Sequence, residues 1–388
     1  MGTPPRSSGE PDPRIGPGAE PHDSDALPDD ALPDDALPDG PLADGAASRL
    51  LERVLFEVKR VIVGQDRLIE RLLVALLARG HCLLEGVPGV AKSLAAQTLA
   101  TVVGGTFHRI QFTPDLVPAD IVGTRIYRPS KEGFDIEPGP VIANLVLADE
   151  INRAPAKVQS ALLEAMAERQ VSIGGRTFPM PEPFLVLATQ NPVEHEGVYQ
   201  LPEAQRDRFL MKVEVDYPTA SDELAILYRM SVDAPRARPL LRAEQVVQLQ
   251  RVADQVFVHH AIAEYVVRLV LATRNPEAFG LFDVAEQLTY GASPRATLGL
   301  VAAARGLALL RGREYVLPSD IAELAGDVIA HRLVLSFDAV ADGVSARTLV
   351  DRVLDAVPPP RVAPNQPPGP QPATRPRQVD LGIGVESA

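Results

Sequence analysis

Apolar residues in the central part of the chain follow two kinds of pattern. Runs with apolar side chains at helical spacing predict amphipathic helices; they are 48–60, 68–77 and 158–169. Short runs that read as strands alternate with them; they are 81–85, 107–112, 144–148 and 184–188, and the last two are apolar without a break from Leu145 to Ala148 and from Phe184 to Ala188. Unbroken runs of this length are typical of strands buried on both faces of a parallel sheet. Strands that alternate with helices in this way predict a doubly wound α/β domain.

Two segments interrupt this alternation. Residues 114–140 contain Pro or Gly at six internal positions, and the segment is too long for a plain loop in a compact domain. We therefore expect an inserted functional element there. Residues 170–178 predict a β-hairpin whose turn is Gly174-Gly175.

The pattern changes at Thr219, where Thr219 and Asp222 have the spacing of a capping box. Helical runs without strand signals follow; they are 221–231, 243–257, 260–273, 294–310 and 319–332. These runs predict a small all-α domain. The chain therefore divides into a tail at 1–46, an α/β domain at 47–218, an all-α domain at 219–357 and a second tail at 358–388.

The two tails have a composition that does not support a packed core. Ten of the 37 prolines lie in residues 1–45 and nine lie in 358–388. Residues 1–45 also carry eleven acidic side chains against Arg6 and Arg14, so most of the net charge of −13 belongs to this segment. Closely spaced prolines forbid helix and the aspartates repel one another, which predicts solvated, disordered tails. A tethered acidic ligand for a partner is the alternative.

Composition limits the class of protein. Cys82 is the single cysteine, which excludes an internal disulfide and favours a small buried residue over a catalytic one. No apolar run approaches the ~18 residues that a membrane span needs, and the N-terminus has no signal pattern, so we expect a cytoplasmic protein without membrane insertion. The mild acidity outside the tails argues against a broad nucleic-acid surface.

A phosphate-binding loop is the first chemical feature. Residues 86–93 read Gly-Val-Pro-Gly-Val-Ala-Lys-Ser between the apolar run 82–84 and a helical run. This arrangement points backbone N–H groups and a helix N-terminus at one spot, which suits a polyphosphate. Lys92 would contact the β- and γ-phosphates and Ser93 would bind Mg²⁺. The usual glycine before the lysine is replaced by Ala91, which fits if its φ is already helical.

Paired acids are the second feature. Asp149 and Glu150 end the apolar strand 145–148, at the carboxyl edge where open α/β sheets bind ligands. Asp149 would hold Mg²⁺ and Glu150 would polarise the attacking water. Asn191 follows the next strand and could orient that water. Taken singly, the acids could be solvated loop residues and Asn191 a turn residue.

Arginines near the end of the α/β domain form the third feature. Arg206 and Arg208 flank Asp207, just before Phe209. An arginine that reaches the γ-phosphate of a neighbouring copy couples hydrolysis to assembly. We favour Arg208 for this role, and Arg206 is the alternative. The alternative is a surface arginine paired with Asp207.

Together these segments resemble the MoxR family of AAA+ ATPases over residues ~48–357. The segments that carry the resemblance are 63–65 (Val-Gly-Gln), 86–93, 148–154, 188–192, 201–205, 207–209 and 292–295 (Ala-Ser-Pro-Arg). The resemblance implies that Asp149 and Glu150 are Walker B, Asn191 is sensor 1, Arg208 is the arginine finger and Arg295 is sensor 2 on a lid. It implies a nucleotide site that also includes Val63, Gly64, Gln65, Gly86, Val87, Pro88, Gly89, Val90, Ala91, Lys92, Ser93 and Leu94. Alanine before the lysine is normal in this family.

The resemblance also implies what the protein does. It implies an ATPase that uses Mg²⁺, assembles as a hexameric ring, and remodels or matures client proteins. Partners with von Willebrand factor A domains, and metal or cofactor insertion, are implied by the family alone. Segment 113–140 would be the helix-2 insertion and 170–180 the hairpin before sensor 1. A nucleotide-binding scaffold with little hydrolysis and a DNA-directed motor are the alternatives.

Overall fold

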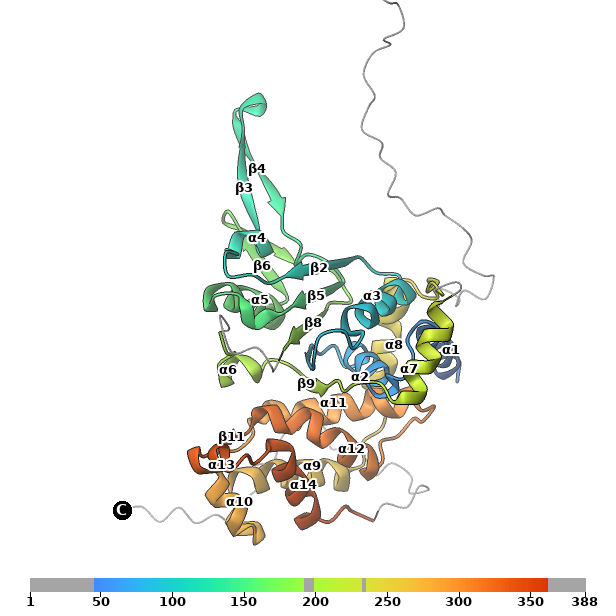
Figure 1. The fold of residues 1–388 in the computed structure, drawn as a ribbon, viewed down its shortest axis with the longest axis vertical. Helices are drawn as coiled ribbons and strands as arrows, with labels where there is room; N and C mark the ends of the chain where they lie inside the picture. The colour runs from blue at the N-terminus through green and yellow to red at the C-terminus, as the bar shows by residue number, and fades with distance from the viewer. Residues whose placement is uncertain (1–44, 192–198, 232–234, 362–388) are drawn as a thin grey trace, which may run out of the picture. The chain divides into compact units, whose positions relative to one another are not determined.

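The computed structural model describes residues 45–191, 199–231 and 235–361. Its helices and strands alternate through the first half, and helices dominate the second (Figure 1). The predicted tails, 1–46 and 358–388, lie almost wholly outside the described residues, as does Pro192. The first half contains α1 (Ala46–Val61), α2 (Asp66–Leu77), β1 (Cys82–Glu85), α3 (Lys92–Val103), β2 (Phe107–Gln111), α4 (Pro118–Val122), β3 (Gly123–Arg128), β4 (Gly133–Pro138), β5 (Leu145–Asp149), α5 (Ala156–Glu168), β6 (Gln170–Ile173), β7 (Arg176–Pro179), β8 (Leu185–Gln190), α6 (Glu203–Arg206) and β9 (Met211–Glu214).

The second half begins with α7 (Ala220–Met230) and α8 (Ala243–Gln255). It continues with α9 (His260–Arg274), α10 (Phe282–Gln287), β10 (Leu288–Tyr290), α11 (Pro294–Leu310), α12 (Pro318–Ile329), β11 (Val334–Leu335), α13 (Phe337–Ala341) and α14 (Ala346–Ala356). The described residues also form short 3₁₀ segments: η1 (Pro129–Lys131), η2 (Ile151–Arg153), η3 (Pro276–Phe279) and η4 (Ala330–Arg332). None of the helices in the described part of the chain combines the length and apolarity that a bilayer crossing needs.

Five parallel strands form the central sheet in the order β2-β5-β8-β1-β9. Side chains of successive residues on one strand point into different cores: Leu145 and Leu147 join the core with α1, α2 and α3, whereas Val146 and Ala148 join the core with α5. Both faces are therefore covered, which explains the unbroken apolar runs in the sequence. The predicted doubly wound parallel sheet is confirmed.

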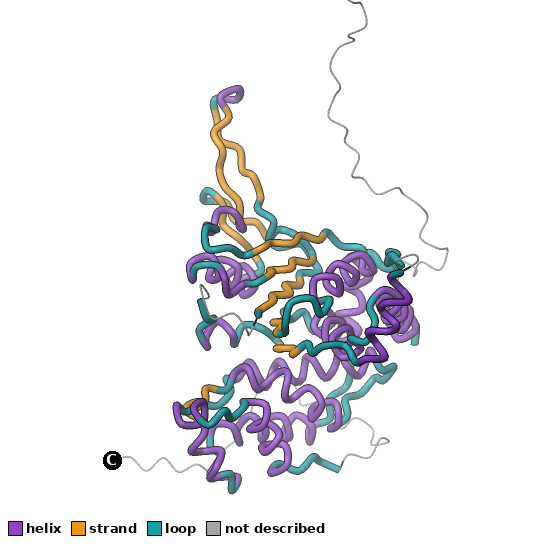
Figure 2. Tube along the Cα trace, viewed as in Figure 1, coloured by secondary structure: helices purple, strands orange, loops and turns teal. Residues whose placement is uncertain are grey.

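The insertion expected at 114–140 is helix α4 followed by the antiparallel hairpin of β3 and β4. Figure 2 shows these two strands running away from the central sheet. Exposed aromatic side chains lie on the hairpin: Tyr127 packs edge-to-face on Phe134, and the Arg125 guanidinium lies 4.5 Å from the centre of the Phe134 ring. The second predicted hairpin is β6 paired with β7, with its turn at Gly174-Gly175.

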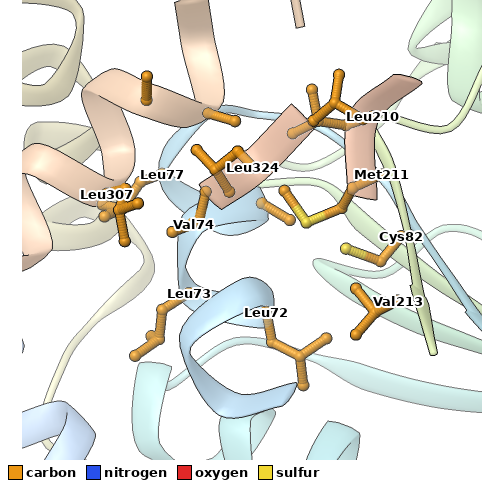
Figure 3. Packing of buried hydrophobic residues seen from close by; sticks show 14 of the residues in the cluster. Leu72, Leu73, Val74, Leu77, Cys82, Leu210, Met211, Val213, Leu307 and Leu324 are labelled. Atoms are coloured by element: carbon orange, nitrogen blue, oxygen red, sulfur yellow. The ribbon is translucent and has the colours of Figure 1, made fainter. Parts of the chain in front are cut away.

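The expected helical lid is confirmed, with additions that the sequence did not predict. Strands β10 and β11 form a two-stranded antiparallel pair where only helices were expected, and α10, α13 and α14 were not predicted. Helices α11 and α12 pack on α2 and β9, so one apolar core runs through both halves. Figure 3 shows its centre, where Leu307 and Leu324 of the lid helices lie near Leu73, Leu77 and Met211.

The predicted boundary between residues 218 and 219 stays a prediction. Helix α8 follows that boundary, but it packs against α2 and α11. The backbone N–H groups of Leu240 and Leu241 donate to the carbonyl of Val102 at 2.9 and 3.1 Å. The start of the second half is therefore held closely by the first.

Candidate active site

The loop between β1 and α3 has the backbone of a phosphate-binding turn. Gly86 lies so close to the next strand that a Cβ there would be 2.3 Å from the carbonyl oxygen of Val215, so a side chain is excluded. Gly89 adopts φ +89°, a conformation that favours glycine. Helix α3 then begins at Lys92, and its N-terminus faces the space over the loop.

Ala91 differs from the sequence-based expectation. Its φ of +63° and ψ of +19° lie in the left-handed region, not in the right-handed helical region that we expected. This conformation costs an L-residue about 1–2 kcal/mol relative to the right-handed helix. The turn requires this left-handed conformation because α3 begins at the next residue. Glycine adopts that conformation without steric cost, which explains why it is the usual residue at this position of the motif.

Lys92 is half-buried, and its ammonium group contacts the loop itself. Its Nζ donates to the carbonyl oxygens of Gly86 and Val87, the second at 3.2 Å. Burial lowers the pKa of Lys92, and the nearby carboxylates of Asp149, Glu150 and Glu85 oppose this shift. A polyphosphate in front of the loop would favour the charged form of this lysine.

The paired acids lie at the carboxyl end of β5, beside the loop. The Ser93 hydroxyl is 3.4 Å from Asp149 Oδ2, and the Thr189 hydroxyl donates to Asp149 Oδ1 at 2.6 Å. The backbone N–H of Glu150 donates to the same Thr189 hydroxyl at 2.8 Å. Glu150 has φ +57°, a left-handed conformation uncommon for a residue with a side chain and often found at functional sites.

Two residues of β2, Arg109 and Gln111, also reach these acids, and sequence reasoning missed both. Arg109 donates to Asp149 Oδ2 from Nη2 at 2.6 Å and from Nε at 3.1 Å. Gln111 Nε2 donates to Glu150 Oε2 at 2.7 Å. Strand β2 pairs with β5 with Gln111 opposite Asp149. Only this register brings them to the site. The available signal was that Arg109 and Gln111 are two polar residues at alternate positions of the strand, and so lie on one face of it.

Asn191 follows β8, which lies between β5 and β1 in the sheet. Its side chain is buried and lines the same cavity as Lys92 and Asp149. The structure therefore brings these three side chains together at one edge of the sheet, because the carboxyl ends of parallel strands meet there.

The cavity at this edge has a volume of about 360 Å³. It is lined by Pro88, Gly89, Ala91, Lys92, Ser93, Leu94, Arg109, Asp149, Glu150, Thr189 and Asn191. The family resemblance also placed six other residues in the site that are not in this lining: Val63, Gly64, Gln65, Gly86, Val87 and Val90. Val90 is buried, and Gln65 Nε2 donates to the carbonyl of Asp216 at 3.0 Å.

The donor atoms in this cavity fit Mg²⁺. The Ser93 hydroxyl and the Asp149 carboxylate are adjacent oxygen donors, the type that this ion prefers. The described residues contain no group of three or more His, Cys, Asp or Glu side chains that could hold a metal alone.

The arginines predicted for the site lie elsewhere. Neither Arg208 nor Arg295 lines the cavity of its own chain among the described residues. Arg208 is exposed and donates to the carbonyl of Leu163 at 2.7 Å, so the alternative of a pair with Asp207 is wrong for this residue. Arg295 Nη1 lies 3.4 Å from Asp207 Oδ2. Arg206 Nη2 lies 3.7 Å from Glu203 Oε1.

A larger cavity, of about 570 Å³, lies between β9 and the lid. Its lining includes Arg206, His331 and the first residues of α14, but none of the loop or acid residues described above. Chemistry decides between the two cavities: only the smaller one joins a phosphate-binding turn to paired carboxylates.

Comparisons with known proteins agree with this geometry. Residues 81–211 match the family model "ATPase family associated with various cellular activities (AAA)", and residues 282–353 match the model "AAA lid domain". The chain is 64% identical over 317 residues to Chaperone MoxR1 of Mycobacterium tuberculosis, covering 82% of this chain and 84% of that protein. This chain belongs to the MoxR family of AAA+ ATPases.

The chain is also similar to two other proteins. The Bacillus subtilis protein YeaC, which is uncharacterized, is 43% identical over 79% of this chain and 94% of its own length. A crystal structure of a candidate ATPase from Cytophaga hutchinsonii superimposes with a TM-score of 0.77 at 45% identity, covering 81% of this chain and 96% of that one. The resemblance inferred from the sequence is thus confirmed, and AAA+ membership implies nucleotide binding.

Proposed function

We propose that this MoxR-family protein hydrolyses ATP in the cavity at the carboxyl edge of its sheet. The observation that supports this most is that Lys92, Asp149 and Asn191, from separate segments, line one cavity in front of a phosphate-binding turn. Lys92 would exchange its loop carbonyls for the β- and γ-phosphates. Ser93 and Asp149 would hold Mg²⁺, which supplies positive charge beside those phosphates when bound.

Glu150 and Asn191 act on the water in this proposal. The Glu150 carboxylate accepts a proton from the attacking water, and the Asn191 amide orients that water in line with the γ-phosphate. Arg109 holds Asp149 by two hydrogen bonds and balances its charge. Gln111 holds the Glu150 carboxylate in place by a single hydrogen bond.

We further propose that the protein works as a ring of copies, hexameric as the family resemblance implies, with Arg208 reaching the γ-phosphate of a neighbour. The exposed position of Arg208, away from its own cavity, supports this. A chaperone-like role toward client proteins is supported by the relative named as a chaperone. Clients with von Willebrand factor A domains and a role in metal or cofactor insertion rest on the family resemblance alone.

Turnover and nucleotide binding measured on the same variants test the proposal. Glu150→Gln should keep Mg-ATP binding and lose about 10²-fold or more in turnover, because general-base catalysis is worth that much. Lys92→Ala should lose binding, and Glu277→Gln, on an exposed carboxylate of the lid, should change neither. A wild-type protein that binds Mg-ATP without turnover would favour the scaffold instead. Salt-dependent DNA binding would favour the DNA-directed motor.

A further inference from the structure

Arg332, in the 3₁₀ segment η4 of the lid, is a buried cation that hydrogen-bonds to residues 207–210 of the first half. Its side chain is 3% exposed. Nε donates to Asp207 Oδ1 at 2.9 Å, Nη1 to the carbonyl of Leu210 at 3.1 Å, and Nη2 to the carbonyl of Phe209 at 2.6 Å. The planar fork of an arginine can make this set of bonds, and a lysine cannot. One lid side chain therefore fixes the backbone that directly follows Arg206 and Arg208.

Asp207 collects further groups from the lid. The Ser293 hydroxyl donates to Asp207 Oδ1 at 2.7 Å, and Arg295 Nη1 approaches Asp207 Oδ2 at 3.4 Å. Ser293 also caps α11, because its oxygen accepts from the backbone N–H of Arg295 at 3.2 Å. Asp207, which lies between Arg206 and Arg208 in the sequence, is thus held by the first residues of α11, the lid helix that carries Arg295.

The buried charges of Arg332 and Asp207 oppose separation of the two residues. Burial lowers the pKa of Arg332 to about 10, and the Asp207 carboxylate opposes that shift. A buried ion pair is a weak source of stability compared with apolar packing, but it leaves an uncompensated charge if the partners separate. The contact therefore resists any movement of the lid that leaves the 207–210 segment behind.

We propose that Asp207 and Arg332 are positioning residues that lock Arg208 and Arg295 into one unit, so that both arginines enter the nucleotide site of the same neighbouring copy together. This inference rests on the proposed ring-forming ATPase. Both arginines are exposed and outside the cavity of their own chain, and Asp207 joins the segments that carry them. A shift of the lid in one copy then changes hydrolysis in the next copy, through Arg332.

Mixing two inactive chains tests this directly. Chain X carries Lys92→Ala, so it lacks its own nucleotide site but keeps its arginines. Chain Y carries Arg208→Ala and Arg295→Ala, so it keeps its nucleotide site but lacks both arginines that the proposal assigns to the neighbouring site. Each alone should be nearly inactive, and a mixture should recover turnover because X supplies arginines to Y.

Asp207→Asn is then added to X or to Y. In X it should lower the recovered turnover by about tenfold or more, since an arginine finger contributes about 10³–10⁵ to kcat. In Y, which lacks the two arginines that Asp207 is proposed to position, the effect should be under about twofold. A purely structural role would give equal losses in both chains, and that result, or no loss in X, overturns the proposal.

Three further variants of chain X guard against misfolding as the cause. Asp207→Glu should keep part of the recovered turnover, and Ser293→Ala, which removes one bond to Asp207, should give a smaller loss than Asp207→Asn. Asp283→Asn breaks a surface ion pair of the lid, Arg352 to Asp283 at 2.7 Å, and should have no effect. If the wild-type protein shows no turnover at all, the proposed function fails and this inference with it. Turnover that is indifferent to Asp207 in X overturns only the inference.

Discussion

A buried carboxylate that joins the two halves offers the sharpest test of the energetics. Asp327 of α12 has no exposed side-chain surface. It accepts from Arg71 Nε at 2.8 Å, from Arg347 Nη1 at 3.0 Å and from Arg67. Asp327→Asn keeps the shape of the side chain but removes the charge that these three guanidinium groups share.

The expected cost is large because the change leaves buried positive charge without its partner. Breaking a buried ion pair from one side typically costs about 3–5 kcal/mol, against a total stability of about 5–15 kcal/mol. At roughly 2–4 °C per kcal/mol, the thermal midpoint should fall by about 6–20 °C. Arg71 keeps its contact with Glu323 at 3.0 Å, which favours the lower part of that range.

Asp283→Asn is the matched control. Its pair with Arg352 has an N–O distance of 2.7 Å, but the two side chains are 60% and 39% exposed. Exposed pairs contribute about 0.2–1 kcal/mol, so this variant should shift the midpoint by less than about 4 °C. Both variants are compared by thermal unfolding in low and high salt, since salt screens an exposed pair more strongly than a buried one. Equal shifts for the two variants would refute the argument that burial sets the cost.

Three smaller predictions follow from single groups. Burial lowers the pKa of His81 to about 4, below the unfolded value of 6.5. Folding stability should therefore fall by about 3 kcal/mol between pH 6.5 and 4. Urea unfolding midpoints measured across this pH range check the prediction. If the His81→Asn variant lost stability with falling pH as steeply as the wild-type protein, the prediction would be wrong. Ala91→Gly should leave the free energy of unfolding equal or higher because the left-handed backbone suits glycine, whereas Ala91→Val should lower that free energy by at least about 1 kcal/mol. Thermal or urea unfolding checks this, and the reverse order would count against the φ of +63°. Because burial lowers the pKa of Lys92, Mg-ATP affinity should weaken as pH rises, with a midpoint below the ordinary 10.5; calorimetric titrations that stay flat up to that pH would argue against it.

The sequence alone determined the elements and most of the candidate chemistry. Unbroken apolar runs next to helical runs specify a parallel sheet covered on both faces, and Gly86 to Ser93 specifies a strand–turn–helix that can hold phosphate. These are local properties, because periodicity and glycine placement act within a few residues of chain. The expected places of Lys92, Asp149 and Asn191 follow from them, since parallel strands bring their carboxyl ends to one edge.

Only the tertiary structure decided which distant side chains touch. Arg109 and Gln111 reach the acids because β2 pairs with β5 in one register, and a shift of one residue would turn them to the other face. The hydrogen bonds from Arg332 to residues 207–210 also depend on contacts that local patterns do not encode. Hydrogen bonds from Arg208 to Leu163 and from Arg295 to Asp207, across 45 and 88 residues of chain, hold the two arginines where they lie, and no local pattern in the sequence predicts these contacts.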